Sequence, residues 1–191
     1  MAKYSAGILL VVLLAFTACE RPTPPAVNED GAAYDLTQYL QEQKARMQAQ
    51  KPMVLKTVTT ENKPSETVET DEINWEDELS VFEQLDLNKP TLAEYYTKEV
   101  FELESGGYAV EYKKLEESEP LVHYLYLSFA PNRQLMEVNA ILQDQNPLFF
   151  SRRKVQLQAE PGTGNISSYS IKGVQKLIFS DSLHYKVDAN L

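Results

Sequence analysis

Residues 121–159, LVHYLYLSFAPNRQLMEVNAILQDQNPLFFSRRKVQLQA, contain three runs in which apolar and polar side chains alternate. Turn-forming residues separate the runs, Pro131-Asn132-Arg133 after the first and Asp144-Gln145-Asn146-Pro147 after the second. Alternation with a period of two is typical of β-strands, and short turns join antiparallel neighbours. The stretch therefore predicts three consecutive antiparallel strands, over residues 121–129, 135–143 and 149–159.

The same pattern continues on both sides of these strands. Upstream, residues 100–104 and 108–115 flank Ser105-Gly106-Gly107, which is typical of a hairpin. Downstream, residues 166–179 form a further run in which Gly173 is a candidate break, and a last run begins at Leu183. No helix-length segment separates the runs, so the pattern excludes the crossover connections of a parallel sheet.

One or two helices precede the strands. Asn74 and Asp77 predict an N-terminal cap, Pro90 predicts a second short helix, and one apolar face recurs at helical spacing in Trp75, Leu79, Phe82 and Leu85. We expect Trp75 and Phe82 in the core. Residues 74–191 are therefore predicted to be a globular α+β domain, with these helices packed on an antiparallel meander of about six to eight strands, a curved sheet or partial barrel.

Residues 35–73 predict a weak helix and a linker. Asp35 caps a helix that Pro52 ends, but its apolar stripe is thin, and Gln43 stands where the stripe should continue. We therefore expect a solvated stalk helix, with a partner-binding or loosely docked helix as the alternatives. Residues 59–72 hold a proline, several threonines and five acidic residues beside one lysine, which predicts an acidic linker.

The first 18 residues predict an export signal. Lys3 is their one charged residue, and an apolar run extends from Ala6 to Phe16. A basic start, a short apolar run and small residues at the end are typical of a secretory signal. The run is too short to cross about 30 Å of hydrocarbon as a helix, which needs about 20 residues. Cys19, the one cysteine of the chain, follows directly.

The junction resembles the lipobox of a bacterial lipoprotein precursor, in which an apolar residue and two small residues precede the cysteine. Thr17, Ala18 and Cys19 fit this pattern, whereas Phe16 replaces the usual leucine. The resemblance covers residues 1–19 only. It implies that the Cys19 thiol receives a diacylglyceryl group, that the signal is removed before it, and that the new amino end is acylated, for instance by palmitate. An ordinary cleaved signal followed by a stray cysteine is the alternative.

Residues 19–34 are rich in proline and polar side chains, so we expect a flexible tether behind the lipid. Two or more acyl chains hold a protein stably at a membrane. The chain has a net charge of −10, which becomes −11 without Lys3, and an anionic leaflet repels such a body. The acyl chains on Cys19 are therefore expected to be the membrane contact.

Composition and spacing argue against several chemistries. The acidic balance speaks against nucleic acid as a partner. Two histidines and one cysteine leave too few ligands for a catalytic zinc site, and His123 shares an apolar face, as a core or edge histidine does. Asp181, Ser182 and His184 are near neighbours in a strand and cannot form a relay. We therefore predict no metal, no cofactor and no enzyme activity.

Tyr124 and Tyr126 are candidate ligand- or partner-binding residues. In the run 121–129 they lie on the face opposite Leu125 and Leu127. A sheet covered by a helix on one side needs only one apolar face. The two tyrosines are therefore expected either to line a groove or to pack beneath the N-terminal helix.

Arg152 and Lys154 are the second candidate surface, because they belong to the one basic cluster of an acidic chain. Alternation places them on one face of a strand and Arg153 on the other. They are expected to form a small site for an anion such as a phospholipid, lipopolysaccharide or acidic segment, or to pair with acids such as Glu137.

These observations predict a lipid-anchored, non-enzymatic protein of the cell envelope, on the outer membrane in preference to the inner one. Its partner would be another envelope component, a protein or a lipid. A periplasmic carrier of lipids or lipoproteins, with an acyl-binding groove, is the alternative. An envelope hydrolase has no specific support.

Overall fold

The computed structural model describes residues 34–61 and 63–191. The predicted signal at 1–18, the predicted lipidation site Cys19 and all but the last residue of the predicted tether lie outside the described residues. The elements of the described part are, in chain order, α1 (Leu36–Gln50), β1 (Val54–Thr60), β2 (Glu66–Thr70), α2 (Trp75–Glu83), the 3₁₀ helix η2 (Pro90–Tyr95), β3 (Tyr96–Glu102), β4 (Tyr108–Lys114), β5 (Val122–Phe129), β6 (Leu135–Asn146), β7 (Phe149–Ala159), β8 (Ile166–Leu177) and β9 (Leu183–Asn190).

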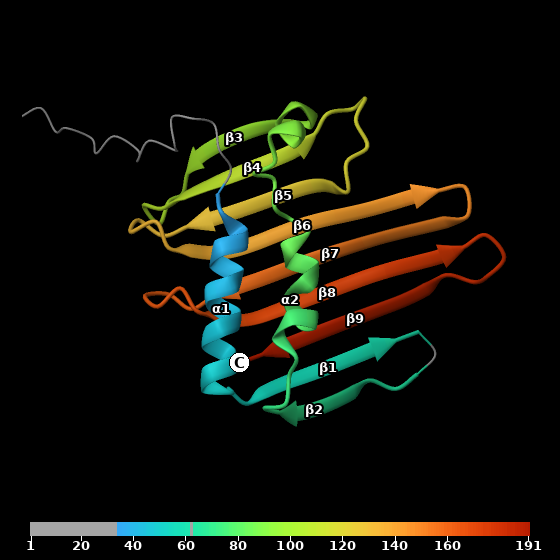
Figure 1. Cartoon of the computed structure of the whole chain (residues 1–191), viewed down its shortest axis with the longest axis horizontal. Coiled ribbons are helices and arrows are strands. Elements are labelled where there is room, and N and C mark those ends of the chain that lie inside the picture. Colours follow the sequence, from blue (N-terminus) through green and yellow to red (C-terminus); the bar gives the residue numbers. More distant parts are fainter. Residues whose placement is uncertain (1–33, 62) are drawn as a thin grey trace, which may run out of the picture. The chain divides into compact units, whose positions relative to one another are not determined.

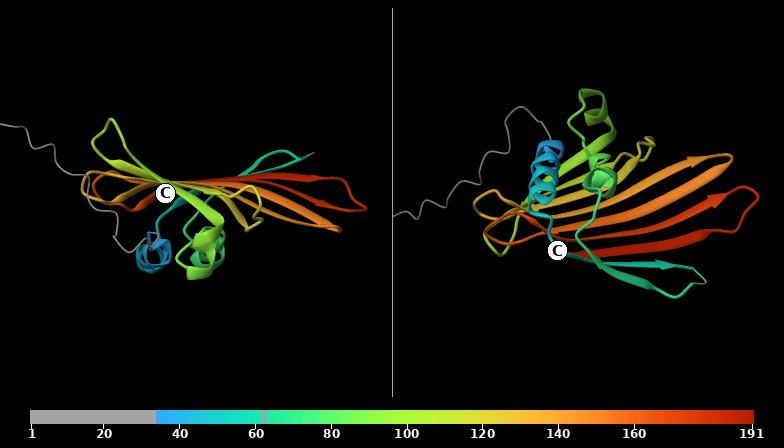
Figure 2. Two further views of the ribbon diagram at one scale, coloured as in Figure 1. Left: turned by 90° about the horizontal axis from the view of Figure 1, so that it is seen from above. Right: turned by 60° about the horizontal axis from the view of Figure 1, so that its bottom comes forward.

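The strands of the described residues form one nine-stranded sheet in the order β2-β1-β9-β8-β7-β6-β5-β4-β3. Every neighbouring pair is antiparallel. Both α-helices lie across the same face, and the other face carries no helix (Figures 1 and 2). This confirms the predicted α+β fold with helices on a meander sheet. The sheet is curved and is not closed into a barrel.

The segment predicted as an acidic linker is a β-hairpin, so that prediction was wrong. β1 pairs with β2 and, on its other side, with β9, which adds two strands to the predicted six to eight. Threonines are favoured in strands, and two cross-strand contacts join hydroxyl groups, Thr57 with Thr67 at 3.0 Å and Thr59 with Ser65 at 2.8 Å. The many acids are tolerated because β2 is an exposed edge strand.

Helix α1 is docked on the sheet and is not a solvated stalk. Leu36, Leu40 and Met47 are buried, and so is Gln43, which interrupts the apolar stripe in the sequence. The Gln43 side-chain oxygen accepts a hydrogen bond of 3.0 Å from the backbone N–H of Ile166 in β8. The folded body therefore begins near Tyr34, and not at residue 74 as predicted. The exposed side chains of the helix, such as Gln41 and Gln48, lie on its outer side.

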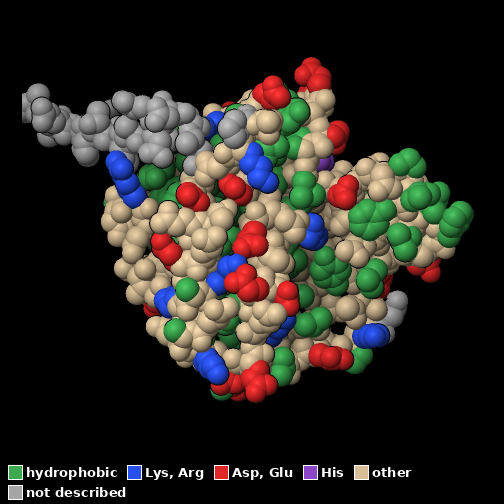
Figure 3. Space-filling view, viewed as in Figure 1, with side chains coloured by type: hydrophobic (Ala, Val, Ile, Leu, Met, Phe, Trp, Pro, Cys, Tyr) green, Lys and Arg blue, Asp and Glu red, His purple; other side chains and the backbone are tan. Residues whose placement is uncertain are grey.

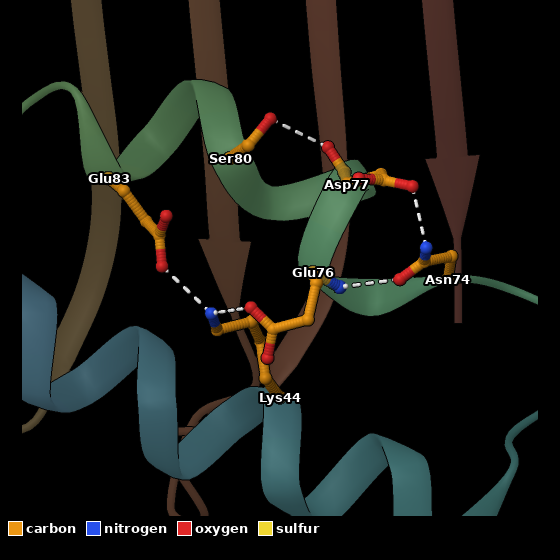
Figure 4. A network of polar contacts seen from close by, with 6 residues as sticks. All are labelled: Lys44, Asn74, Glu76, Asp77, Ser80 and Glu83. Carbon is orange, nitrogen blue, oxygen red and sulfur yellow. Dashed lines mark hydrogen bonds and ion pairs between the residues drawn. The ribbon is translucent and has the colours of Figure 1, made fainter.

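An ion pair joins the two helices. The Lys44 ammonium of α1 donates to Glu76 and, over 2.8 Å, to Glu83, both in α2 (Figure 4). These two hydrogen bonds raise the pKa of Lys44, although burial of the side chain works against them.

Asn74 caps α2 as predicted, because its side-chain oxygen accepts from the N–H of Glu76. None of the helices in the described part of the chain is long and apolar enough to span a membrane.

The core lies between the helices and the sheet. Trp75 and Phe82 are fully buried, as predicted, and Phe82 packs edge to face on Tyr169 of β8 with the ring centres 6.2 Å apart. Strands β4 to β7 contribute alternate side chains to this core, for example Val155 and Leu157 in β7, whereas the edge strand β2 contributes none. Among the described residues, the core cluster and the hydrophobic side chains packed against it lie between Tyr34 and Leu191, so residues 20–191 include all of them.

Two local features of the sheet differ from what the sequence pattern suggests. The register shifts between Val122 and Tyr124, so Val122 lies opposite Leu142 and joins the core, although alternation groups it with the tyrosines. β8 runs unbroken through Gly173, because Gly173 pairs with Tyr185 in β9. A Cβ atom at this glycine would lie 2.3 Å from the Tyr185 ring, so the ring occupies the space that a side chain would need.

Replacing Gln43 with leucine tests the docking of α1. Leucine would complete the apolar stripe, yet it would leave the buried N–H of Ile166 without an acceptor. We expect the free energy of unfolding to fall by about 1–3 kcal/mol. Urea unfolding followed by the fluorescence of Trp75, the one tryptophan, measures it.

Gln41→Leu on the exposed side of the same helix is the matched control and should leave the free energy of unfolding nearly unchanged. Equal effects of the two substitutions would contradict the docked position of α1.

Candidate functional site

Tyr124 and Tyr126 lie on the face of the sheet that the helices leave uncovered, which we call the helix-free face. Their neighbours Leu125 and Leu127 point into the core on the other side. The alternative in which the tyrosines pack beneath the N-terminal helix was therefore wrong. The Tyr126 ring lies 6.3 Å from Phe101 of β3.

The Tyr124 hydroxyl interacts with a carboxylate of the neighbouring strand. Burial, together with the hydrogen bond that the hydroxyl donates to Glu111, raises the pKa of Tyr124 to about 12. The same hydrogen bond and the one from Lys113 lower the pKa of Glu111. This end of the helix-free face is thus a partly apolar area whose charged groups are already paired.

Arg152 and Lys154 are exposed on the helix-free face, and Arg153 points to the other face, where its guanidinium donates to Gln84 over 3.0 Å. The predicted alternation is confirmed. The predicted pairing with Glu137 was wrong. Glu137 lies opposite Gln158 in the register, and its carboxylate accepts from the Asn139 and Gln158 amides.

A row of lysines crosses three strands at this point. Lys154 of β7 lies directly opposite Lys172 of β8, which lies directly opposite Lys186 of β9. Residues opposite one another on neighbouring strands share a face, with Cβ atoms about 5 Å apart. With the neighbouring cations they form a group that we call the basic strip: Arg152, Lys154, Lys172, Lys176 and Lys186.

The basic strip has few counter-charges. Among residues 34–61 and 63–191, Lys186 forms an ion pair with Asp188 at 2.8 Å, and the other four members form none. The sequence showed only the cluster at 152–154, because Lys172 and Lys186 join it through strand register. Like charges directly opposite one another destabilise a sheet, so the row opposes folding.

The three strands of the lysine row, together with β6, end in an exposed apolar cluster. The β6–β7 and β8–β9 turns lie side by side, and the N–H of Ile178 donates to the carbonyl of Leu148 over 3.0 Å. Phe179 is 96% exposed, Leu148 62% and Leu177 57%. Figure 3 shows hydrophobic side chains gathered at this end of the sheet. We call this cluster the apolar tip: Leu148, Leu177, Ile178, Phe179 and Leu183.

A polar hollow of about 1020 Å³ lies between the β4–β5 connection and the end of β6. His123 lines it, and its Nε2 lies 3.6 Å from a carboxylate oxygen of Glu119. Burial, followed by the charge of Lys114, lowers the pKa of His123. The side chains that line the hollow carry no hydroxyl or thiol group, so the geometry offers His123 no nucleophile to activate.

Within the described residues, no three His, Cys, Asp or Glu side chains form a group that could hold a metal ion. His184 lies on the exposed part of β9, opposite Val174. The helix-free face with its basic strip and the adjoining apolar tip are thus the features that packing within the body does not explain.

Replacing Lys172 with glutamine tests the repulsion within the row, because Lys172 has a lysine on each side. We expect the free energy of unfolding to rise by roughly 0.2–1 kcal/mol at low ionic strength. The gain should shrink in about 0.5 M salt, which screens exposed charges. Urea unfolding at both salt concentrations measures it.

Lys176→Gln on the same strand is the control, because Lys176 lies opposite Phe150 and not opposite a lysine. A gain of equal size in both variants would show that the local excess of positive charge on this face, and not the lysine row, sets the effect.

Comparison with known proteins adds no relative from which a function follows. No family model, no curated protein and no solved structure matches the chain. Function therefore has to be argued from the residues at positions 1–19 and from the two surfaces described above.

Proposed function

We propose that the protein is a lipid-anchored, non-enzymatic module of the cell envelope that binds an anionic envelope component with the helix-free face of its sheet. The fatty acids on Cys19 hold it at a membrane, in keeping with the lipobox at residues 16–19. The outer membrane is the proposed location in preference to the inner one.

The observation that carries the binding role is the basic strip. An acidic chain needs no such concentration of positive charge for solubility, and three lysines in one register row oppose folding. Four of the five cations lack an ion pair within the described residues, so an anion can contact them without first displacing a carboxylate. Charge-assisted hydrogen bonds to phosphate or carboxylate oxygens would offset the repulsion.

The packing does not favour a carrier with an acyl chain between helices and sheet. That space is filled by side chains of both layers, including Phe82 of α2 and Tyr169 of β8, which are in ring contact. The Tyr169 hydroxyl also donates to Glu78 of α2 over 2.6 Å, which ties the helix to the sheet at this point. An acyl chain would have to displace these groups. We therefore propose a binding module and not a carrier.

Replacing Cys19 with alanine tests the lipid anchor, since it removes the thiol that the lipobox offers for acylation. We expect the wild-type protein to fractionate with membranes and to carry the mass of its acyl chains. The variant should gain no acyl mass and should lose firm membrane attachment in carbonate-washed fractions.

Thr17→Ser is the matched control, because it keeps a small residue in the lipobox and should leave acylation intact. An unmodified Cys19 thiol in the wild-type protein, or Cys19→Ala protein that still resists carbonate extraction, would overturn the proposed anchor.

The anion-binding role is tested with a soluble polyanion, inorganic polyphosphate on a column. Residues 20–191 should be retained at low salt despite their net negative charge, because the basic strip acts as a local site. Lys154→Gln combined with Lys172→Gln should elute at clearly lower salt.

Lys51→Gln combined with Lys89→Gln removes the same charge from exposed positions outside the basic strip and should elute like the wild type. Flow-through of the wild-type protein, or the same loss in both double variants, would count against a binding site on this face.

A further inference from the structure

The apolar tip is a surface for which folding in water gives no reason. Its side chains come from two turns that are adjacent in space and 30 residues apart in the chain, Leu148 and Ile178 being joined through their backbones. β6 to β9 extend past both helices to reach it (Figure 1). Exposed turns are normally polar, and an aromatic ring that is 96% exposed gains nothing from the fold.

The two hairpins that end in the apolar tip carry more positive than negative charge. The two hairpin segments 141–154 and 172–188 contain six Lys and Arg residues and three acidic ones, against 12 basic and 25 acidic residues in the rest of the chain. Asp144 in β6 and Asp181 in the β8–β9 turn are the acidic groups of these hairpins nearest the tip, and the neighbouring connections bring Glu61 and Glu119 to the same end of the sheet. The two hairpins that end in the tip are thus net positive, although the chain as a whole is net negative.

The spacing of cations and apolar groups matches a lipid surface. Lys176 directly precedes Leu177 of the tip and lies opposite Phe150, and Arg152 stands two residues after Phe150. Two residues of a strand cover about 7 Å, so these cations stand within one headgroup layer of the apolar side chains. Apolar side chains next to Lys and Arg are the composition with which interfacial segments enter the boundary between headgroups and acyl chains.

We propose that the apolar tip inserts into the interface of an anionic phospholipid bilayer while Arg152 and Lys176, the members of the basic strip nearest to the tip, contact the lipid phosphates. A protein partner would need a pocket shaped for the two turns, and nothing on this face indicates its form. A lipid surface has no fixed shape to match. Binding to it requires only exposed apolar side chains, which the tip supplies, and positive charge, which the basic strip supplies. This inference rests on the proposed function, in which the helix-free face binds an anionic envelope component. It identifies that component as a membrane surface.

The experiment uses residues 20–191, which contain the whole core but lack Cys19 and its acyl chains. Its two probes are vesicles of phosphatidylcholine alone and vesicles with about 30% phosphatidylglycerol, in sedimentation assays. We expect binding to the anionic vesicles, binding at least tenfold weaker to the neutral ones, and loss of binding in about 0.5 M salt.

Three variants separate the parts of the proposal. Phe179→Ser removes the most exposed apolar side chain and should weaken vesicle binding about tenfold or more, while leaving retention on polyphosphate unchanged. Lys176→Gln should weaken it roughly fivefold. Met53→Ser, which removes an exposed apolar side chain away from the tip, is the matched control and should bind like the wild type.

Failure to bind anionic vesicles, or binding that Phe179→Ser leaves unchanged, would overturn the proposal. A wild-type protein that sediments as a dimer, and becomes monomeric with Phe179→Ser, would show that a second copy covers the tip and would overturn it too. These results are independent of the anchor, because Cys19 is absent, and of anion binding in general, because polyphosphate retention reports on the basic strip by itself.

Discussion

One-sided coverage of the sheet is the constraint on which the other features depend. Both helices pack on the same face, so the strands beneath them send one set of side chains into a filled core and the other set into solvent. The core side accounts for stability, through residues such as Phe82 and Leu157. The helix-free face has no packing role of that kind. The lysine row on this face is therefore a feature that folding did not require, and that repulsion opposes.

Much of the fold could be predicted because period-two alternation and turn residues are local signals. The strands from residue 100 to the end of the chain and the caps at Asp35 and Asn74 follow from them. Two elements could not be predicted for a common reason: their partners are distant in sequence. Gln43 is compatible with burial only because the N–H of Ile166 meets it, and the threonine-rich β1 becomes a strand by pairing with β9.

The candidate site, like the fold, could be predicted within single strands but not across them. The alternation of Arg152 and Lys154 is visible in the chain, but their neighbours Lys172 and Lys186 join them only through a register that spans two further strands. The tip likewise combines two turns that look unrelated in the sequence. Tyr124 and Tyr126 illustrate the opposite case, since their face was clear from alternation, while the layer that would cover it was not. A surface whose side chains come from several paired strands can therefore be recognised only once the strand pairing is known.

The net charge of the chain and the proposed membrane contact are compatible because charge acts locally. At physiological ionic strength the Debye length is about 8 Å, shorter than β6, which spans about 40 Å at some 3.4 Å per residue. A bilayer in contact with the tip therefore interacts mainly with Lys176 and Arg152 and only weakly with the acidic residues at the far end of the strands. The net negative charge of the chain opposes a flat approach of the whole body. The positive charge of the two hairpins thus favours one orientation, tip first, which a uniform negative charge would not provide.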